Sequence, residues 1–208
     1  MRRKEFEVQD RELLEEVLKD AEVGYLAFNG GDGWPRVTPL NFVFDGRILW
    51  HGAVAGERCE GLRLDSRATF AAVSVQTYIP SHFTAEENAA AATVAFRSVQ
   101  VQGRCRTIED PEEKCAILNR LMHKYQPEGR YKKISPEDPL YRKVLASTGV
   151  YALVAEGITG KFKLLQNKSE EERRKIVARL EGRGTPADLS VAKEILKNLK
   201  GKEEPWQR

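Results

Sequence analysis

The sequence predicts a mainly β fold with helices, in which antiparallel strands form a barrel with helices at its ends. Strand-like segments joined by short turns fill the first half of the chain. Strands and helices do not alternate throughout, as they do in parallel-sheet proteins. The length of 208 residues suits one domain, or one domain with an appendage, and allows a full core without disulfides.

The first half opens with a helix. Asp10 is a good N-cap for it, and the apolar residues after it have helical spacing. Strands are then expected over residues 23–29, 36–44, 47–51 and 68–76, with a short helix over 55–64. Asp45-Gly46 separates two of these strands and predicts a tight primed hairpin turn. Pro39 inside a strand predicts an edge or bulged strand, because proline cannot donate to the ladder.

The second half contains longer elements. After an irregular connection over residues 78–87, a strand is expected over 93–107, a helix over 110–125 that Asp110 caps, a short helix over 139–146 and a strand over 149–156. Helices over 169–180, with a capping box from Ser169 and Glu172, and over 187–199 end the chain. We expect a barrel domain over 1–160 and a basic helical extension over 161–208.

Composition narrows the class of protein. Hydrophobic residues make up 41% and charged residues 31%, as in globular proteins. Neither a membrane-length apolar stretch nor a secretory signal is visible, which predicts a cytoplasmic protein without membrane contact. The net charge is +3, and residues 161–208 alone carry +5, from 13 Lys and Arg against 8 Asp and Glu. This excess favours a solvated helical face and leaves nucleic-acid contact as an alternative.

No recognisable catalytic or metal-binding motif is present. The three cysteines have no zinc-site spacing and are expected to be reduced thiols, and no metal site is predicted. Gly30-Gly31-Asp32-Gly33 is not a dinucleotide-binding fingerprint. If the protein is an enzyme, its chemistry is expected to come from a cofactor.

The most informative stretch is Pro35 to Arg58. Main-chain groups of Thr38 to Asn41 around Pro39 could hydrogen-bond the edge of a flat ring, and Gly52 after His51 allows close approach to the backbone. Arg58 at the start of a helix suits a phosphate. A flat ring with a phosphate is the shape of flavin mononucleotide (FMN). The alternative is an ordinary hairpin with a surface arginine.

Several segments resemble the pyridoxamine 5′-phosphate oxidase-like split-barrel flavoproteins, nearest the nitroimidazole-resistance branch. They are Pro35–Phe42, the strand ending in His51, Gly56–Arg58, Tyr78–Ser81, Phe96–Gly103 and Thr148–Leu153. Residues 160–171 resemble the closing motif of Pai-type FMN-binding negative transcriptional regulators.

The resemblance implies a six-stranded antiparallel split barrel that forms a homodimer with FMN at the interface. It places Val37, Thr38, Pro39, Leu40 and Asn41 along the ring, Arg58 at the phosphate, Arg97, Ser98, Lys161 and Gln166 within reach of the flavin, and His51 as the catalytic residue. Two departures stand out: Glu57 replaces a second basic residue beside Arg58, and the oxidases' C-terminal substrate-binding arginine motif is absent. The second departure argues against oxidation of pyridoxamine 5′-phosphate.

The leading hypothesis is an FMN-dependent oxidoreductase that passes electrons from a donor to a small acceptor, such as a nitro compound. One alternative is a ligand-sensing negative regulator of transcription. Another is a haem protein on the same barrel, with His51 or His82 as axial ligand. At single residues, Arg97 could instead pair with a carboxylate, and Lys161 could be an edge-strand lysine that prevents aggregation.

Overall fold

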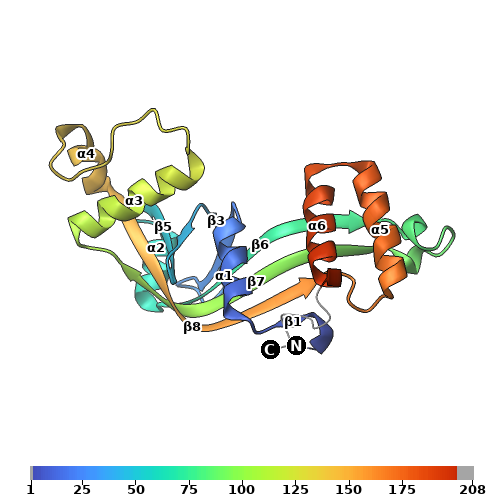
Figure 1. The fold of residues 1–208 in the computed structure, drawn as a ribbon. Coiled ribbons are helices and arrows are strands. Elements are labelled where there is room, and N and C mark those ends of the chain that lie inside the picture. Colours follow the sequence, from blue (N-terminus) through green and yellow to red (C-terminus); the bar gives the residue numbers. More distant parts are fainter. Residues whose placement is uncertain (1, 201–208) are drawn as a thin grey trace. The chain divides into compact units, whose positions relative to one another are not determined.

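The computed structural model describes residues 2–200 (Figure 1). The strands are β1 (Glu7–Val8), β2 (Gly24–Asn29), β3 (Pro35–Leu40), β4 (Val43–Phe44), β5 (Arg47–Ala53), β6 (Arg67–Ile79), β7 (Thr93–Thr107) and β8 (Thr148–Lys163). The α-helices are α1 (Arg11–Asp20), α2 (Glu57–Leu64), α3 (Pro111–Tyr125), α4 (Pro139–Ser147), α5 (Glu170–Arg183) and α6 (Pro186–Lys200). Short 3₁₀ helices are η1 (Lys4–Phe6), η2 (Ser81–Phe83) and η3 (Ala89–Ala91).

The predicted class, a mainly antiparallel α+β fold, is confirmed. The hydrogen-bonded strand order is β3-β2-β6-β7-β8-β5-β4, with β1 paired to β8, and the described residues thus form eight strands rather than the expected six. The expected strand over 36–44 is divided by Asn41 and Phe42 into β3 and β4. The strand expected to end at Glu156 continues to Lys163, because its last part pairs with β1, with Glu7 opposite Lys161.

The described chain divides into two compact units. Unit 1 comprises residues 2–21, 73–99 and 159–200, and unit 2 comprises residues 22–72 and 100–158. Strands β6, β7 and β8 contribute to both units.

Unit 1 is built on helix caps that the sequence predicted. The Asp10 carboxylate accepts a hydrogen bond from the Glu12 amide at 2.9 Å and starts α1. Ser169 and Glu172 form the expected capping box of α5, which lies beside α6 (Figure 1). Helix α1 packs closely on β8, since a Cβ added to Gly160 would lie 2.1 Å from Leu14.

Unit 2 holds an open sheet edge. Strands β3 and β4 end the strand order but follow each other in the chain, and the described residues show no ladder between them. The sheet is therefore split at this point. Among residues 2–200, strand β3 pairs only with β2, where Pro39 lies opposite Tyr25, so the prediction that Pro39 marks an edge strand is confirmed.

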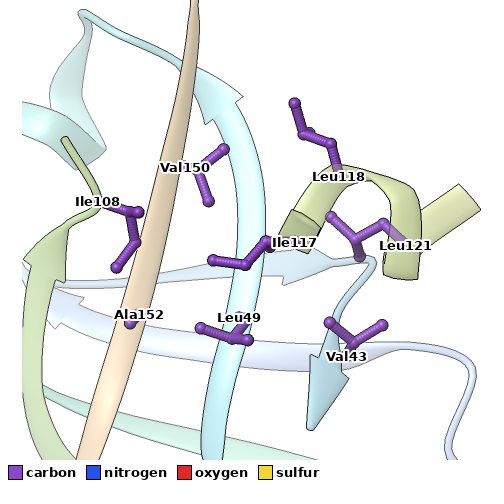
Figure 2. Close-up of a cluster of buried hydrophobic side chains, with 8 residues drawn as sticks. All are labelled: Val43, Leu49, Ile108, Ile117, Leu118, Leu121, Val150 and Ala152. Atoms are coloured by element: carbon purple, nitrogen blue, oxygen red, sulfur yellow. The ribbon is translucent and has the colours of Figure 1, made fainter. Parts of the chain in front are cut away.

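The core of unit 2 joins α3 to the strands at the split. Figure 2 shows the cluster of Val43, Leu49, Ile108, Ile117, Leu118, Leu121, Val150 and Ala152. Beside it, the Tyr125 hydroxyl accepts a hydrogen bond from the Phe42 amide at 2.8 Å and lies 2.7 Å from the Glu22 carbonyl oxygen. Helix α3 thus anchors the link between β3 and β4.

The turn between β4 and β5 differs from the prediction. Phe44 pairs with Ile48, so three residues lie between the paired positions, and of these only Gly46 has a positive φ, of 95°. Primed turns need a positive φ at the first central residue, so that turn type is wrong. The Asp45 carboxylate stabilises the loop by accepting a hydrogen bond from the Arg47 amide at 3.1 Å.

Candidate functional site

A cation without an ion-pair partner lies at the start of α2. The helix begins after Gly56, whose φ is 110°. The first amide groups of a helix have no intrahelical acceptor, and Gly56 has no side chain to accept from them. Arg58 is half-buried in this first turn. Among residues 2–200, its guanidinium makes no hydrogen bond or ion pair. Free amide groups and a free guanidinium together make an anion-binding site.

Two facing glycines leave room for the Arg58 side chain and for the Tyr151 hydroxyl. Gly52 on β5 is directly opposite Gly149 on β8. A Cβ on Gly52 would lie 2.0 Å from Nη2 of Arg58, and a Cβ on Gly149 would lie 2.3 Å from the Tyr151 hydroxyl. The space above Gly52, expected to admit a flat ligand, is therefore filled by the guanidinium of Arg58, which lies 5.7 Å from the Tyr151 ring centroid.

A small hydrogen-bond network supports this arrangement. The Tyr151 hydroxyl donates to the Ala53 carbonyl at 2.6 Å, and the Cys59 thiol lies 3.2 Å from the same oxygen. Burial, with the hydrogen bond to Cys59 next in importance, raises the pKa of Tyr151 to about 12. The phenol therefore stays neutral and leaves the positive charge of Arg58 uncompensated.

Glu57, the acid beside Arg58, has its own partners. Nε of Arg36 on β3 donates to its carboxylate at 2.7 Å, and the same guanidinium pairs with Asp32 at 2.9 Å. Because Arg36 pairs with Glu57, the acid's effect on an anion near Arg58 is reduced. The same ion pair links the start of β3 to the start of α2.

The predicted ring-binding segment lies on the open edge strand. Val37, Pro39 and Asn41 are exposed, whereas Thr38 is half-buried and the Leu40 side chain is buried. Alternate main-chain groups of an edge strand have no partner strand and are free to bind. Leu40 can therefore contribute only its main chain.

His51 and Gly52 lie near the end of β5, where β4 no longer covers that strand. The His51 imidazole is exposed and makes no hydrogen bond to any other residue in the described part of the chain. Its ring nitrogens are available to a ligand.

The other four predicted cofactor residues lie in unit 1. Arg97, with a side chain only 3% exposed, pairs with Glu16 at 3.1 Å and with Glu194 at 2.9 Å. Arg97 therefore pairs with carboxylates, as in the alternative given above, and is not part of the candidate site. Ser98 donates to the Lys161 carbonyl at 3.3 Å.

The remaining two have local contacts as well. The Lys161 ammonium lies 5.5 Å from the Phe96 ring centroid. The Gln166 side chain accepts from the Leu164 amide and donates to the Phe162 carbonyl, both at 2.7 Å, which closes the turn after β8. Contact of Ser98, Lys161 or Gln166 with a flavin stays a prediction.

Unit 2 also contains a cavity that the sequence did not reveal. It measures about 610 Å³. It is lined by residues of the loop before α2, of α2 itself, of the end of β7 and the loop after it, of α3 and α4, and of the start of β8. Cys59 and Cys105 both face it and are free thiols. Burial raises the pKa of Cys105 to about 12, despite the opposing effect of nearby Arg58. The Cys105 thiol is therefore protonated at neutral pH.

Residues 2–200 hold neither a metal-binding cluster nor a membrane-spanning helix. No group of three or more His, Cys, Asp or Glu is arranged to hold a metal ion within residues 2–200. In that part of the chain, no helix is both long and apolar enough to cross a bilayer.

Comparison with known proteins identifies relatives. The family model described as pyridoxamine 5′-phosphate oxidase matches residues 10–162. A search of curated proteins finds no match.

Similar solved structures share the fold. A putative 5-nitroimidazole antibiotic resistance protein from Bacteroides thetaiotaomicron is 20% identical, covers 74% of this chain and 85% of its own, and has a TM-score of 0.59. The flavocytochrome Anf3 from Azotobacter vinelandii is 22% identical over 81% of this chain and 75% of its own, with a TM-score of 0.64. An FAD and heme binding protein from Mycobacterium smegmatis is 18% identical over 81% and 78%, also with a TM-score of 0.64.

Proposed function

The chain belongs to the pyridoxamine 5′-phosphate oxidase family, and on this premise we propose that it is a flavin-dependent oxidoreductase whose FMN moiety binds to unit 2. The observation that carries the proposal is the guanidinium of Arg58, which has no ion-pair partner in the described chain and lies at an uncapped helix start. Buried or half-buried cations without an anion are costly, and a phosphate would satisfy this one.

The residues present fit the FMN moiety in two ways. Arg58 and the first amides of α2 would hold the phosphate, and the exposed edge of β3 from Val37 to Asn41 would hydrogen-bond the ring. When bound, a flavin supplies electron transfer to a small acceptor, of which a nitro compound is our first candidate. His51 would donate a proton from its exposed imidazole, which has no hydrogen-bond partner in the described part of the chain.

We propose a second copy of the chain as partner. Tyr25 and Val37 are 50% and 64% exposed. Tyr25 lies opposite Pro39, and Ala27 lies opposite Val37, so these side chains share one face of β2 and β3. An exposed apolar face of this kind is typical of an interface. Sedimentation should report a dimer, and Val37→Lys should shift it toward monomer.

Flavin titration tests the proposal. Protein freed of chromophore should quench added FMN, and Arg58→Ala should weaken binding by about 1.5–3 kcal/mol, the value of a charge-assisted hydrogen bond. Arg104→Ala, which removes an exposed arginine paired with Glu156, is the control and should bind normally. Protein that takes up no flavin would refute the proposal. A Soret band in the purified protein would favour the haem alternative.

A further inference from the structure

The cavity of unit 2 lies along α2, and Tyr151 borders both it and the proposed phosphate site. Cys59, Leu62 and Arg63 line it, and at 3.6 residues per turn they lie on the face of α2 roughly opposite Glu57. Glu57 is the residue that bonds to β3 through Arg36. A ligand whose ring lies along β3 and whose phosphate meets α2 can therefore continue past the helix start into the cavity.

Basic side chains without partners line this cavity. The side chains of Arg63 and Arg106 make no hydrogen bond or ion pair with any residue between 2 and 200, and both line the cavity. Lys114 also lines it and donates to the Leu145 carbonyl at 2.6 Å. Three cations within one cavity can hold a further phosphate group.

Acidic side chains without partners share the cavity with these cations. Glu60 and Glu109 line it, and neither carboxylate makes an ion pair or hydrogen bond in the described part of the chain. A simple anion would be repelled by them. A ribose would not, because its hydroxyls donate to carboxylates, as in nucleotide-binding folds.

The remaining wall is apolar and aromatic. Val54, Leu62, Ile108 and Ala146 line the cavity together with Tyr151. The Tyr151 ring also contacts Arg58, at 5.7 Å, so one side chain borders both the phosphate site and the cavity. At about 610 Å³ the cavity is in the range of sites for small molecules, about 300–1,000 Å³.

We propose that this cavity holds a second nucleotide half, joined through the phosphate at Arg58, so that the chain prefers a flavin dinucleotide (FAD) over FMN. This inference rests on the proposed function, because it takes the position of the first phosphate from it. Arg63, Arg106 and Lys114 would meet the second phosphate, Glu60 and Glu109 the ribose hydroxyls, and the apolar wall the base.

The test compares FMN and FAD on protein freed of chromophore, with affinity measured by flavin fluorescence. Wild type should bind FAD at least 10-fold more tightly than FMN. The double variant Arg63→Ala/Arg106→Ala should lose this preference and leave FMN binding unchanged, since each lost phosphate contact costs roughly 10-fold. Arg58→Ala should weaken the binding of both flavins. Arg104→Ala is again the control.

The possible failures are distinguishable. Equal affinity for FMN and FAD, or an FAD preference that survives the double variant, overturns the dinucleotide inference alone. Failure to bind either flavin overturns both this inference and the proposed function. Because both arginines are exposed and unpaired, the double variant should melt at the temperature of wild type, which separates loss of binding from loss of folding.

Discussion

Gly52→Ala should impair flavin binding without impairing folding. The new methyl group would lie 2.0 Å from Nη2 of Arg58 and 3.2 Å from its Cζ, so the guanidinium must move. The backbone at Gly52 is not in a glycine-only conformation, and the nearest obstacle is the end of a flexible side chain. The strand itself should tolerate the change.

The size of the effect follows from what Arg58 loses. If the displaced guanidinium can no longer meet the phosphate, binding loses about 1.5–3 kcal/mol, the contribution of a hydrogen bond between charged groups. At about 1.4 kcal/mol per tenfold, this is roughly a 10- to 150-fold rise in the Kd of FMN. Because both changes act through one guanidinium, the double variant Gly52→Ala/Arg58→Ala should bind FMN no more weakly than Arg58→Ala alone.

Fluorescence titration gives the Kd of each variant, and thermal melting checks the fold. Gly157→Ala is the matched control, since it also lies in a strand of unit 2 and its new methyl would come no closer than 3.9 Å to Gln102. If Gly52→Ala binds FMN like wild type while Arg58→Ala does not, Arg58 does not act from the position above Gly52. Additive losses in the double variant would contradict the shared mechanism.

Three further changes test the frame of unit 2. Hydrogen bonds from Arg47 lower the pKa of Asp45 from its usual 3.8 to about 2. The stabilisation that this pair gives the folded state is therefore present above pH 4 and is lost as the pH falls to 2. Asp45→Asn should therefore cost about 1–2 kcal/mol at pH 7 and converge with wild type near pH 2 in urea titrations. Tyr125→Phe leaves the Phe42 amide unpaired and should cost about 1–3 kcal/mol in denaturant unfolding. Gly103→Ala places a methyl 2.0 Å from a backbone carbonyl oxygen and should cost about 3 kcal/mol or more in thermal melts.

Local signals explain which parts of the fold the sequence predicted. Asp10 and Asp110 cap their helices as expected, because capping depends on a side chain and amides two or three residues away. The extent of β8 was not predictable in this way. The two glycines at 157 and 160 favour a break, but pairing with β1 and the close approach of Leu14 to Gly160 stabilise the longer strand.

The candidate site was predictable only where it is local. Arg58 follows Gly56 at a helix start, and both features are visible in the sequence. The fate of Arg97 depends on Glu16 and Glu194, each about 80 to 100 residues away, so no local pattern distinguishes it from a ligand-binding arginine. The cavity could not be predicted from the sequence for the same reason, because its walls come from three separate stretches of unit 2.

The charge balance around α2 explains how an acidic residue can precede the proposed phosphate ligand. A carboxylate in the first turn of a helix interacts favourably with the helix dipole but competes with a bound anion. Glu57 keeps its favourable position at the start of the helix. Its competition with a bound anion is much reduced, because Arg36 on β3 neutralises the carboxylate. Arg36 is itself bound to Asp32, so the hairpin between β2 and β3 supplies and positions the cation that pairs with Glu57. A lone basic residue can then serve where the oxidases of this family carry two.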